Sequence, residues 1–134
     1  MARHLIIGGA RSGKSALARR LADESGLPVS LIATARAGDA EMSDRILRHR
    51  DERPSEWRTV EEPLDLASAL AWEARRGCCV VIDCLTLWLT NCLLEDGLDQ
   101  AESAALSSSP LWQRQRASFL SSLAEAEGEV VLVS

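Results

Sequence analysis

The stretch that decides the fold reads Gly8-Gly9-Ala10-Arg11-Ser12-Gly13-Lys14-Ser15, and it lies between a short apolar segment and a helix-forming one. It fits the pattern G-x-x-x-x-G-K-[ST] of a phosphate-binding loop. Glycines allow the backbone angles that turn successive N–H groups toward an anion, and the following helix directs its positive end at the phosphates. A chance glycine turn is the alternative. The flanking segments favour the loop, which predicts binding of a nucleoside triphosphate.

Two side chains of this loop have distinct predicted roles. Lys14 can reach the β- and γ-phosphates as a point charge, and the Ser15 hydroxyl can hold Mg²⁺. Backbone N–H groups throughout the loop are expected to surround the phosphates. The predicted nucleotide contacts are therefore Gly8, Gly9, Ala10, Arg11, Ser12, Gly13, Lys14 and Ser15.

Outward from the loop, apolar and helix-forming segments alternate. Strands are predicted at residues 4–7, 29–33, 57–61, 79–83 and 130–133, and helices at 15–25, 39–52, 64–76, 85–94 and 111–127, with a loop over 95–110. Apolar strands separated by helices are typical of a parallel sheet covered on both faces. The prediction is an α/β fold, with a mostly parallel sheet and helices on both faces, in one domain over residues 1–134.

Composition excludes several classes of function. The net charge of −5 argues against nucleic acid as a main partner. No apolar run approaches the roughly 18 residues of a membrane span, and no signal peptide is recognisable, so a cytoplasmic location is expected. The four cysteines form no Cys-x-x-Cys pair and the chain has two histidines, so a zinc site is not expected. The cysteines are predicted to be reduced thiols, mostly buried.

Asp83 directly follows the apolar run Cys79-Val-Val-Ile82. A carboxylate at the carboxyl end of such a strand, near a phosphate loop, is a candidate to hold a metal ion directly or through water. The alternative role is an N-cap for the helix that starts near Leu85, because aspartate also serves well there. The prediction is that Ser15 and Asp83 together hold Mg²⁺.

His49 lies among arginines on the helix predicted at 39–52. Arg45 and Arg53 flank it at spacings of four residues, which places them beside it on the helix surface. In one interpretation this is a solvated helix whose acidic residues pair with the arginines. In the other, guanidinium groups neutralise phosphate charge while the neutral imidazole attacks phosphorus.

Eight segments together identify a family: residues 8–15, Ile32-Ala-Thr-Ala35, Asp39-Ala-Glu-Met42, Arg45-Ile46, His49-Arg50, Arg53-Pro54, Trp57-Arg-Thr-Val-Glu61 and Asp83-Cys-Leu-Thr-Leu-Trp-Leu-Thr-Asn91. In this combination the chain resembles the bifunctional adenosylcobinamide kinase/adenosylcobinamide-phosphate guanylyltransferase family of cobalamin biosynthesis. The resemblance covers residues 5 to about 94, and the apolar run at 130–133 fits the next core strand. It implies a P-loop fold of the RecA-like type.

The resemblance implies two reactions. The aminopropanol hydroxyl of adenosylcobinamide takes the γ-phosphate of ATP or GTP, and an active-site histidine, matching His49, then takes GMP from GTP. Adenosylcobinamide phosphate captures that GMP to give adenosyl-GDP-cobinamide. Catalytic roles fall on His49 and Lys14, with Mg²⁺ as cofactor. Further nucleotide contacts are implied at Thr34, Ala35, Arg36, Arg50, Asp51, Glu52, Arg53, Glu61 and Asp83.

The resemblance also implies a homo-oligomer, with a trimer as one form. Family members continue beyond a strand like that at 130–133, so the chain is expected to lack a C-terminal portion of the domain. Two alternative functions remain open from the residues. One is a different P-loop small-molecule kinase that makes no guanylyl adduct, and the other is a non-catalytic nucleotide-binding assembly module.

Overall fold

The structure, a computed structural model, describes residues 3–9, 12–36, 57–75, 77–98 and 105–134. Within these residues the chain forms one five-stranded sheet in the order β1-β5-β4-β2-β3, and every neighbouring pair is parallel. The strands are β1 (Arg3–Ile6), β2 (Val29–Ala33), β3 (Arg58–Glu61), β4 (Cys79–Asp83) and β5 (Val130–Val133). The predicted α/β class and parallel sheet are confirmed.

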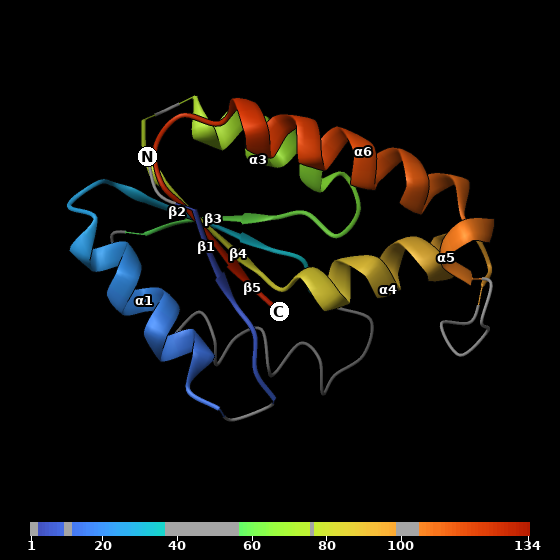
Figure 1. The fold of residues 1–134 in the computed structure, drawn as a ribbon, viewed down its shortest axis with the longest axis horizontal. Helices are drawn as coiled ribbons and strands as arrows, with labels where there is room; N and C mark the ends of the chain where they lie inside the picture. The colour runs from blue at the N-terminus through green and yellow to red at the C-terminus, as the bar shows by residue number, and fades with distance from the viewer. Residues whose placement is uncertain (1–2, 10–11, 37–56, 76, 99–104) are drawn as a thin grey trace.

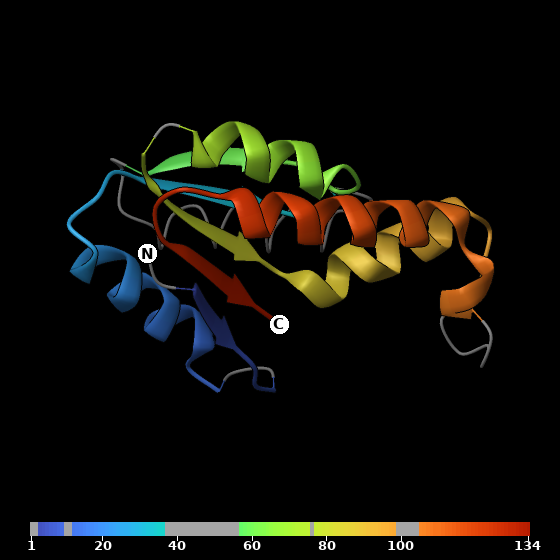
Figure 2. The same ribbon diagram turned by 45° about the horizontal axis from the view of Figure 1, so that its top comes forward.

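Helices cover both faces of the sheet, as predicted. Helix α1 (Lys14–Glu24) packs on one face against β5 and β4, and α3 (Leu66–Ala74) and α6 (Pro110–Glu125) lie side by side on the other (Figures 1 and 2). Helices α4 (Leu85–Glu95) and α5 (Ala105–Ser108) connect β4 to α6. Among these helices none is long and apolar enough to cross a membrane.

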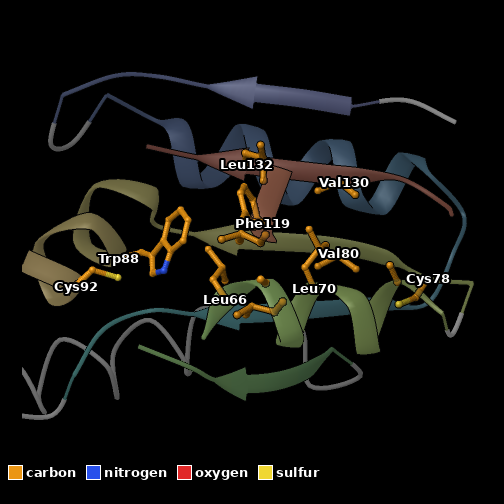
Figure 3. Packing of buried hydrophobic residues seen from close by; sticks show 13 residues of the cluster. Leu66, Leu70, Cys78, Val80, Trp88, Cys92, Phe119, Val130 and Leu132 are labelled. Atoms are coloured by element: carbon orange, nitrogen blue, oxygen red, sulfur yellow. The ribbon is translucent and has the colours of Figure 1, made fainter. Parts of the chain in front are cut away.

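The larger core lies between the sheet and the α3–α6 layer (Figure 3). Trp88 of α4 is 3% exposed, and its ring centroid lies 5.0 Å from those of Trp112 and Phe119 on α6. Its indole N–H donates to the carbonyl oxygen of Leu64 at 2.9 Å. A buried indole N–H needs a hydrogen-bond partner. This bond therefore joins α4 to the segment that precedes α3.

A smaller core lies under α1. Ala18 and Ala22, one turn apart, are its buried residues on the helix, and they pack toward Val81 and Val131. Residues four apart share a face of a helix, and small side chains there allow the helix axis to lie close to the sheet. The first turn of α1 is thereby held at the carboxyl edge of the strands.

Two expectations about local structure were wrong. The first strand was predicted to be buried, but Leu5 and Ile7 are 58% and 75% exposed. The reason is that β1 lies at an edge of the described sheet, with β5 as its neighbour. Residues 95–110 were predicted to be a loop, but helix α5 lies within them and α6 begins at Pro110, where Ser109 caps it. The helix predicted at 39–52 lies outside the described residues.

Candidate nucleotide-binding site

The five strands end in one row at the carboxyl edge of the sheet. In the register, Ile6 lies opposite Val133, Val133 opposite Asp83, Asp83 opposite Ala33, and Ala33 opposite Glu61. Strands in a sheet are about 4.8 Å apart. In the strand order, only β5 lies between β1, which leads into the phosphate loop, and β4, which ends in Asp83.

The faces of the sheet agree with this arrangement. On β4, Cys79 and Val81 belong to the core under α1, while Val80 and Ile82 belong to the core under α3 and α6. Side chains alternate between the faces of a strand, so Asp83 belongs to the α1 side. Helix α1 begins at Lys14, and Ser15 follows in its first turn. The start of α1, with Lys14 and Ser15, and Asp83 thus lie at one edge and on one face of the sheet.

Two glycines of the phosphate loop differ in what they contribute to it. Gly13 precedes α1 with φ of 86°, a left-handed conformation that favours glycine. At Gly8, a Cβ atom would lie 2.5 Å from the hydroxyl oxygen of Ser12, so no larger residue fits without a shift. The N–H of Ser12 donates to the carbonyl oxygen of Gly9 at 3.3 Å, closing the turn. These features support the predicted loop, whereas Ala10 and Arg11 lie outside the described residues.

Lys14 lies across the mouth of the loop. Its Nζ donates to the carbonyl oxygen of Gly8 at 2.8 Å and to the main-chain oxygen of Ser134 at 3.2 Å. Ser134 is also bonded on its other sides: its N–H donates to Ile6, and its hydroxyl lies 2.8 Å from the hydroxyl of Thr86. The end of β5 thus holds the loop lysine, a role for Ser134 that the sequence did not indicate.

Asp83 does not cap α4, so that alternative is wrong. The N-cap is Cys84, whose sulfur accepts a hydrogen bond from the N–H of Leu87 at 3.3 Å.

A hydroxyl and a carboxylate are oxygen donors of the kind that Mg²⁺ prefers, so Ser15 and Asp83 fit the predicted ion chemically. In the part of the chain that the structure describes, no group of three or more His, Cys, Asp or Glu side chains could hold a metal.

Thr34 is one of the predicted nucleotide contacts. Its side chain is fully buried at 0% exposure, and its hydroxyl bonds to the main chain of Cys84. The neighbouring residues are more accessible: Ala35 is half-buried and Arg36 exposed. The Arg36 guanidinium pairs with Glu95 at 3.2 Å, which ties the segment after β2 to the end of α4.

Glu61 ends β3 in register with Ala33 and is exposed at the same edge of the sheet as Asp83. The remaining predicted site residues, His49, Arg50, Asp51, Glu52 and Arg53, lie outside the described residues. His4, the other histidine of the chain, is on β1, with its Nε2 3.9 Å from a carboxylate oxygen of Glu129.

The cysteines are unpaired, as predicted. Cys78, Cys79 and Cys92 are buried, while Cys84 is half-buried. Burial, which disfavours the charged thiolate, raises the pKa of Cys79 and of Cys92 to about 11. These two thiols are therefore protonated near neutral pH and act as small apolar side chains.

Comparison with known proteins places these features in context. Residues 4–134 match the family model described as cobinamide kinase / cobinamide phosphate guanyltransferase. The chain is 54% identical to the bifunctional adenosylcobalamin biosynthesis protein CobP of Pseudomonas aeruginosa over 132 residues, 98% of this chain and 70% of that protein. It is 41% identical over 96 residues to the CobU protein of the same description from Escherichia coli K12, covering 72% of this chain and 52% of that protein.

Proposed function

The chain belongs to the cobinamide kinase / cobinamide phosphate guanyltransferase family, and from this premise we propose the two reactions that it carries out. In the first, adenosylcobinamide is phosphorylated on its aminopropanol hydroxyl by ATP or GTP. In the second, GMP passes from GTP to adenosylcobinamide phosphate through a histidine of the enzyme. The observation that carries the proposal is that the strand leading into the phosphate loop ends at the same edge of the sheet as Asp83, with α1 and Asp83 on one face.

In the proposed kinase step, the substrate hydroxyl oxygen forms a bond to the γ-phosphorus. The bond from that phosphorus to the β–γ bridging oxygen breaks, the nucleoside diphosphate leaves, and the hydroxyl proton is released. Such a transfer depends on positioning and on stabilising the charge of the phosphoryl oxygens. Lys14 lies at the mouth of the loop and can exchange its main-chain partners for phosphate oxygens. The N-terminal end of α1 adds further positive potential.

In the proposed guanylyl step, an imidazole nitrogen of His49 attacks the α-phosphorus of GTP. The bond to the α–β bridging oxygen breaks and pyrophosphate leaves, so that GMP is held on the histidine. A phosphate oxygen of adenosylcobinamide phosphate then attacks the same phosphorus, and the histidine is released unchanged. A neutral imidazole is a competent nucleophile near pH 7.

The proposed holders of Mg²⁺ are Ser15 and Asp83, and the ion would supply positive charge against the phosphate oxygens. The nucleotide contacts predicted at Gly8, Gly9, Ser12 and Gly13 involve the backbone, whose conformation the glycines permit.

The chain is further proposed to act in the cytoplasm as a homo-oligomer, with a trimer as one form. Light scattering of the purified protein measures that state.

The test uses GTP labelled in the α-phosphate, with Mg²⁺ and without corrinoid. We expect a labelled protein adduct that is acid-labile and base-stable, as a phosphoramidate on histidine is. His49→Ala abolishes the adduct and leaves at least part of the kinase activity. His4→Ala removes the other histidine of the chain and retains the adduct.

Three results contradict the proposal in different ways. An adduct of normal yield in His49→Ala removes the histidine assignment. A wild-type protein that binds GTP but forms no adduct and phosphorylates a different small molecule would be a plain P-loop kinase. Binding without any turnover would indicate a nucleotide-binding assembly module.

A further inference from the structure

Thr34 holds the peptide that follows Asp83. Its hydroxyl donates to the carbonyl oxygen of Cys84 at 2.7 Å and accepts from the N–H of Cys84 at 2.9 Å. Its own N–H donates to the carbonyl oxygen of Asp83 at 3.0 Å. Three hydrogen bonds from one residue thus fix the turn at which β4 leaves the sheet.

Asn91 holds Thr34 in turn. It is 4% exposed on α4, and its Nδ2 donates to the carbonyl oxygen of Thr34 at 2.7 Å and to that of Pro63 at 3.1 Å. One carboxamide therefore joins the segment after β2 and the segment after β3. Because Asn91 lies on the helix that follows Cys84, the ends of β2, β3 and β4 form one connected network.

This network is costly to bury unless every member is bonded. A buried hydroxyl or amide without a partner destabilises the protein, whereas an apolar side chain of similar size can fill the same space. Buried polar groups that are all paired fix one conformation. Here the conformation that is fixed is the main chain directly after the Cα atom of Asp83, at the edge of the sheet where the strands end.

We propose that Thr34 and Asn91 are positioning residues that hold the carboxylate of Asp83 where it can act on the Mg²⁺–nucleotide complex. The inference rests on the proposed metal role of Asp83. The Thr34 side chain acts through the main chain of Cys84, because its hydroxyl bonds to that residue and is buried, where a nucleotide has no access. Asn91 acts one step further away, through the carbonyl group of Thr34.

The experiment measures the affinity for GTP by calorimetry over a range of Mg²⁺ concentrations. Thr34→Val keeps the shape of the side chain and removes the hydroxyl, and Thr34→Ser keeps the hydroxyl. Ser30→Ala is the matched control, because it removes another buried hydroxyl, on the strand that precedes Thr34, and this hydroxyl donates to Glu73 at 3.2 Å. Asn91→Asp replaces the donor nitrogen with an oxygen that faces two carbonyl oxygens.

We expect Thr34→Val to weaken Mg²⁺-dependent GTP binding about tenfold, as the loss of the two hydrogen bonds of this buried hydroxyl allows. Asn91→Asp acts in the same direction, while Thr34→Ser and Ser30→Ala stay within about twofold of wild type. Thermal unfolding separates these effects from stability, because Ser30→Ala lowers the melting temperature without changing the Mg²⁺ dependence. Combining Thr34→Val with Asp83→Asn is expected to add nothing to Asp83→Asn alone, since both changes act on one carboxylate.

The outcomes separate the inference from the proposed function. If Asp83→Asn weakens Mg²⁺-dependent binding but Thr34→Val and Asn91→Asp do not, the positioning inference is overturned and the role of Asp83 stands. Additive losses in the double variant also overturn it, because Thr34 would then act independently of Asp83. If Asp83→Asn has no effect, the metal role of Asp83 fails, and the inference fails with it.

Discussion

The ammonium group of Lys14 donates a hydrogen bond to the main-chain oxygen of Ser134, 3.2 Å away, across 120 positions of sequence. The same nitrogen bonds to Gly8, so the positive charge bridges the phosphate loop and the end of β5. Both partners are main-chain oxygens that phosphate oxygens can replace. In the proposed function, the loop lysine would exchange these bonds to neutral main-chain oxygens for stronger, charge-assisted bonds to phosphate oxygens.

This relationship predicts a large effect of Lys14→Met on nucleotide binding. The variant keeps an extended side chain but loses the charge-assisted bonds to phosphate. We expect the affinity for Mg²⁺–GTP to fall about 100-fold, which corresponds to one or two such bonds. Titration calorimetry measures the loss.

Ser134→Ala is the control for this prediction. The contact of Lys14 involves the main-chain oxygen, and the side chain of Ser134 contacts Thr86 instead. GTP affinity in this variant should stay within about threefold of wild type. A loss as large as that of Lys14→Met would mean that the Ser134 hydroxyl itself serves the nucleotide.

A second prediction concerns stability at the start of β5. Gly128 has φ of +84°, and a Cβ atom there would lie 2.6 Å from the carbonyl oxygen of Cys78. Gly128→Ala therefore combines an unfavourable backbone conformation with a clash against main chain. The expected loss in the free energy of unfolding is about 2–4 kcal/mol, measured by urea denaturation.

Gly97→Ala is the matched variant. Gly97 also has positive φ, at +72°, but no heavy atom of the described residues lies within 4 Å of the position that a Cβ atom would take there. Only the backbone cost of about 1 kcal/mol is expected. Equal losses at the two glycines would show that the contact with Cys78 contributes nothing.

A third prediction follows from the thiols. With a pKa of about 11, Cys79 and Cys92 are about one-thousandth thiolate at pH 8, and the thiolate is the form that reacts. In the folded protein, iodoacetamide should label the half-buried Cys84 first, as mass spectrometry of the peptides measures. Cys79 and Cys92 should react only in urea. Labelling of either at the rate of Cys84 would contradict the burial described above.

A fourth prediction concerns pH. The hydroxyl of Ser109 donates to Asp96 at 2.6 Å and the N–H of Leu111 at 3.0 Å, and these bonds lower the pKa of the Asp96 carboxyl below its ordinary value of 3.8. A group whose pKa is lowered by folding stabilises the protein above its unfolded pKa, and that stability is lost as the pH falls through the folded pKa.

Asp96→Asn tests this directly. The variant should melt at a lower temperature than wild type at pH 7, and the difference should shrink as the pH falls below 3.8, because the wild-type carboxyl then becomes protonated. Differential scanning calorimetry at pH 7 and pH 3 measures both values. A constant difference across that range would contradict the lowered pKa.

The sequence predicted the buried strands well because their signal is local. Residues 29–33, 79–83 and 130–133 were predicted with the bounds that β2, β4 and β5 have in the structure. Each is a mostly apolar run that ends at or just before a polar residue, as is typical of strands buried on both faces. The order of strands is not local, so the exposure of Leu5 on β1 was not foreseen.

Helix ends were predicted less well. Ser109 followed by Pro110 is a helix start signal, with an N-cap and proline at the first position, but the preceding serines favoured a loop.

The phosphate loop was predictable because its chemistry lies within eight consecutive residues. The burial of Thr34 was not, because it depends on Cys84 and Asn91, which lie 50 and 57 positions away.

The pairing of β1 also bears on when the glycine-rich motif can become ordered during synthesis of the chain. Among the described strands, β1 pairs with β5, with Arg3 opposite Val130 and Ile6 opposite Val133. A nascent chain that has emerged from the ribosome only as far as α4 carries the whole glycine-rich motif but lacks the strand against which it is braced. Pairings so distant in sequence form late, because closing a long loop costs entropy before any contact is gained. We therefore expect the glycine-rich motif, although it is translated early, to become ordered only after β5 has been synthesised.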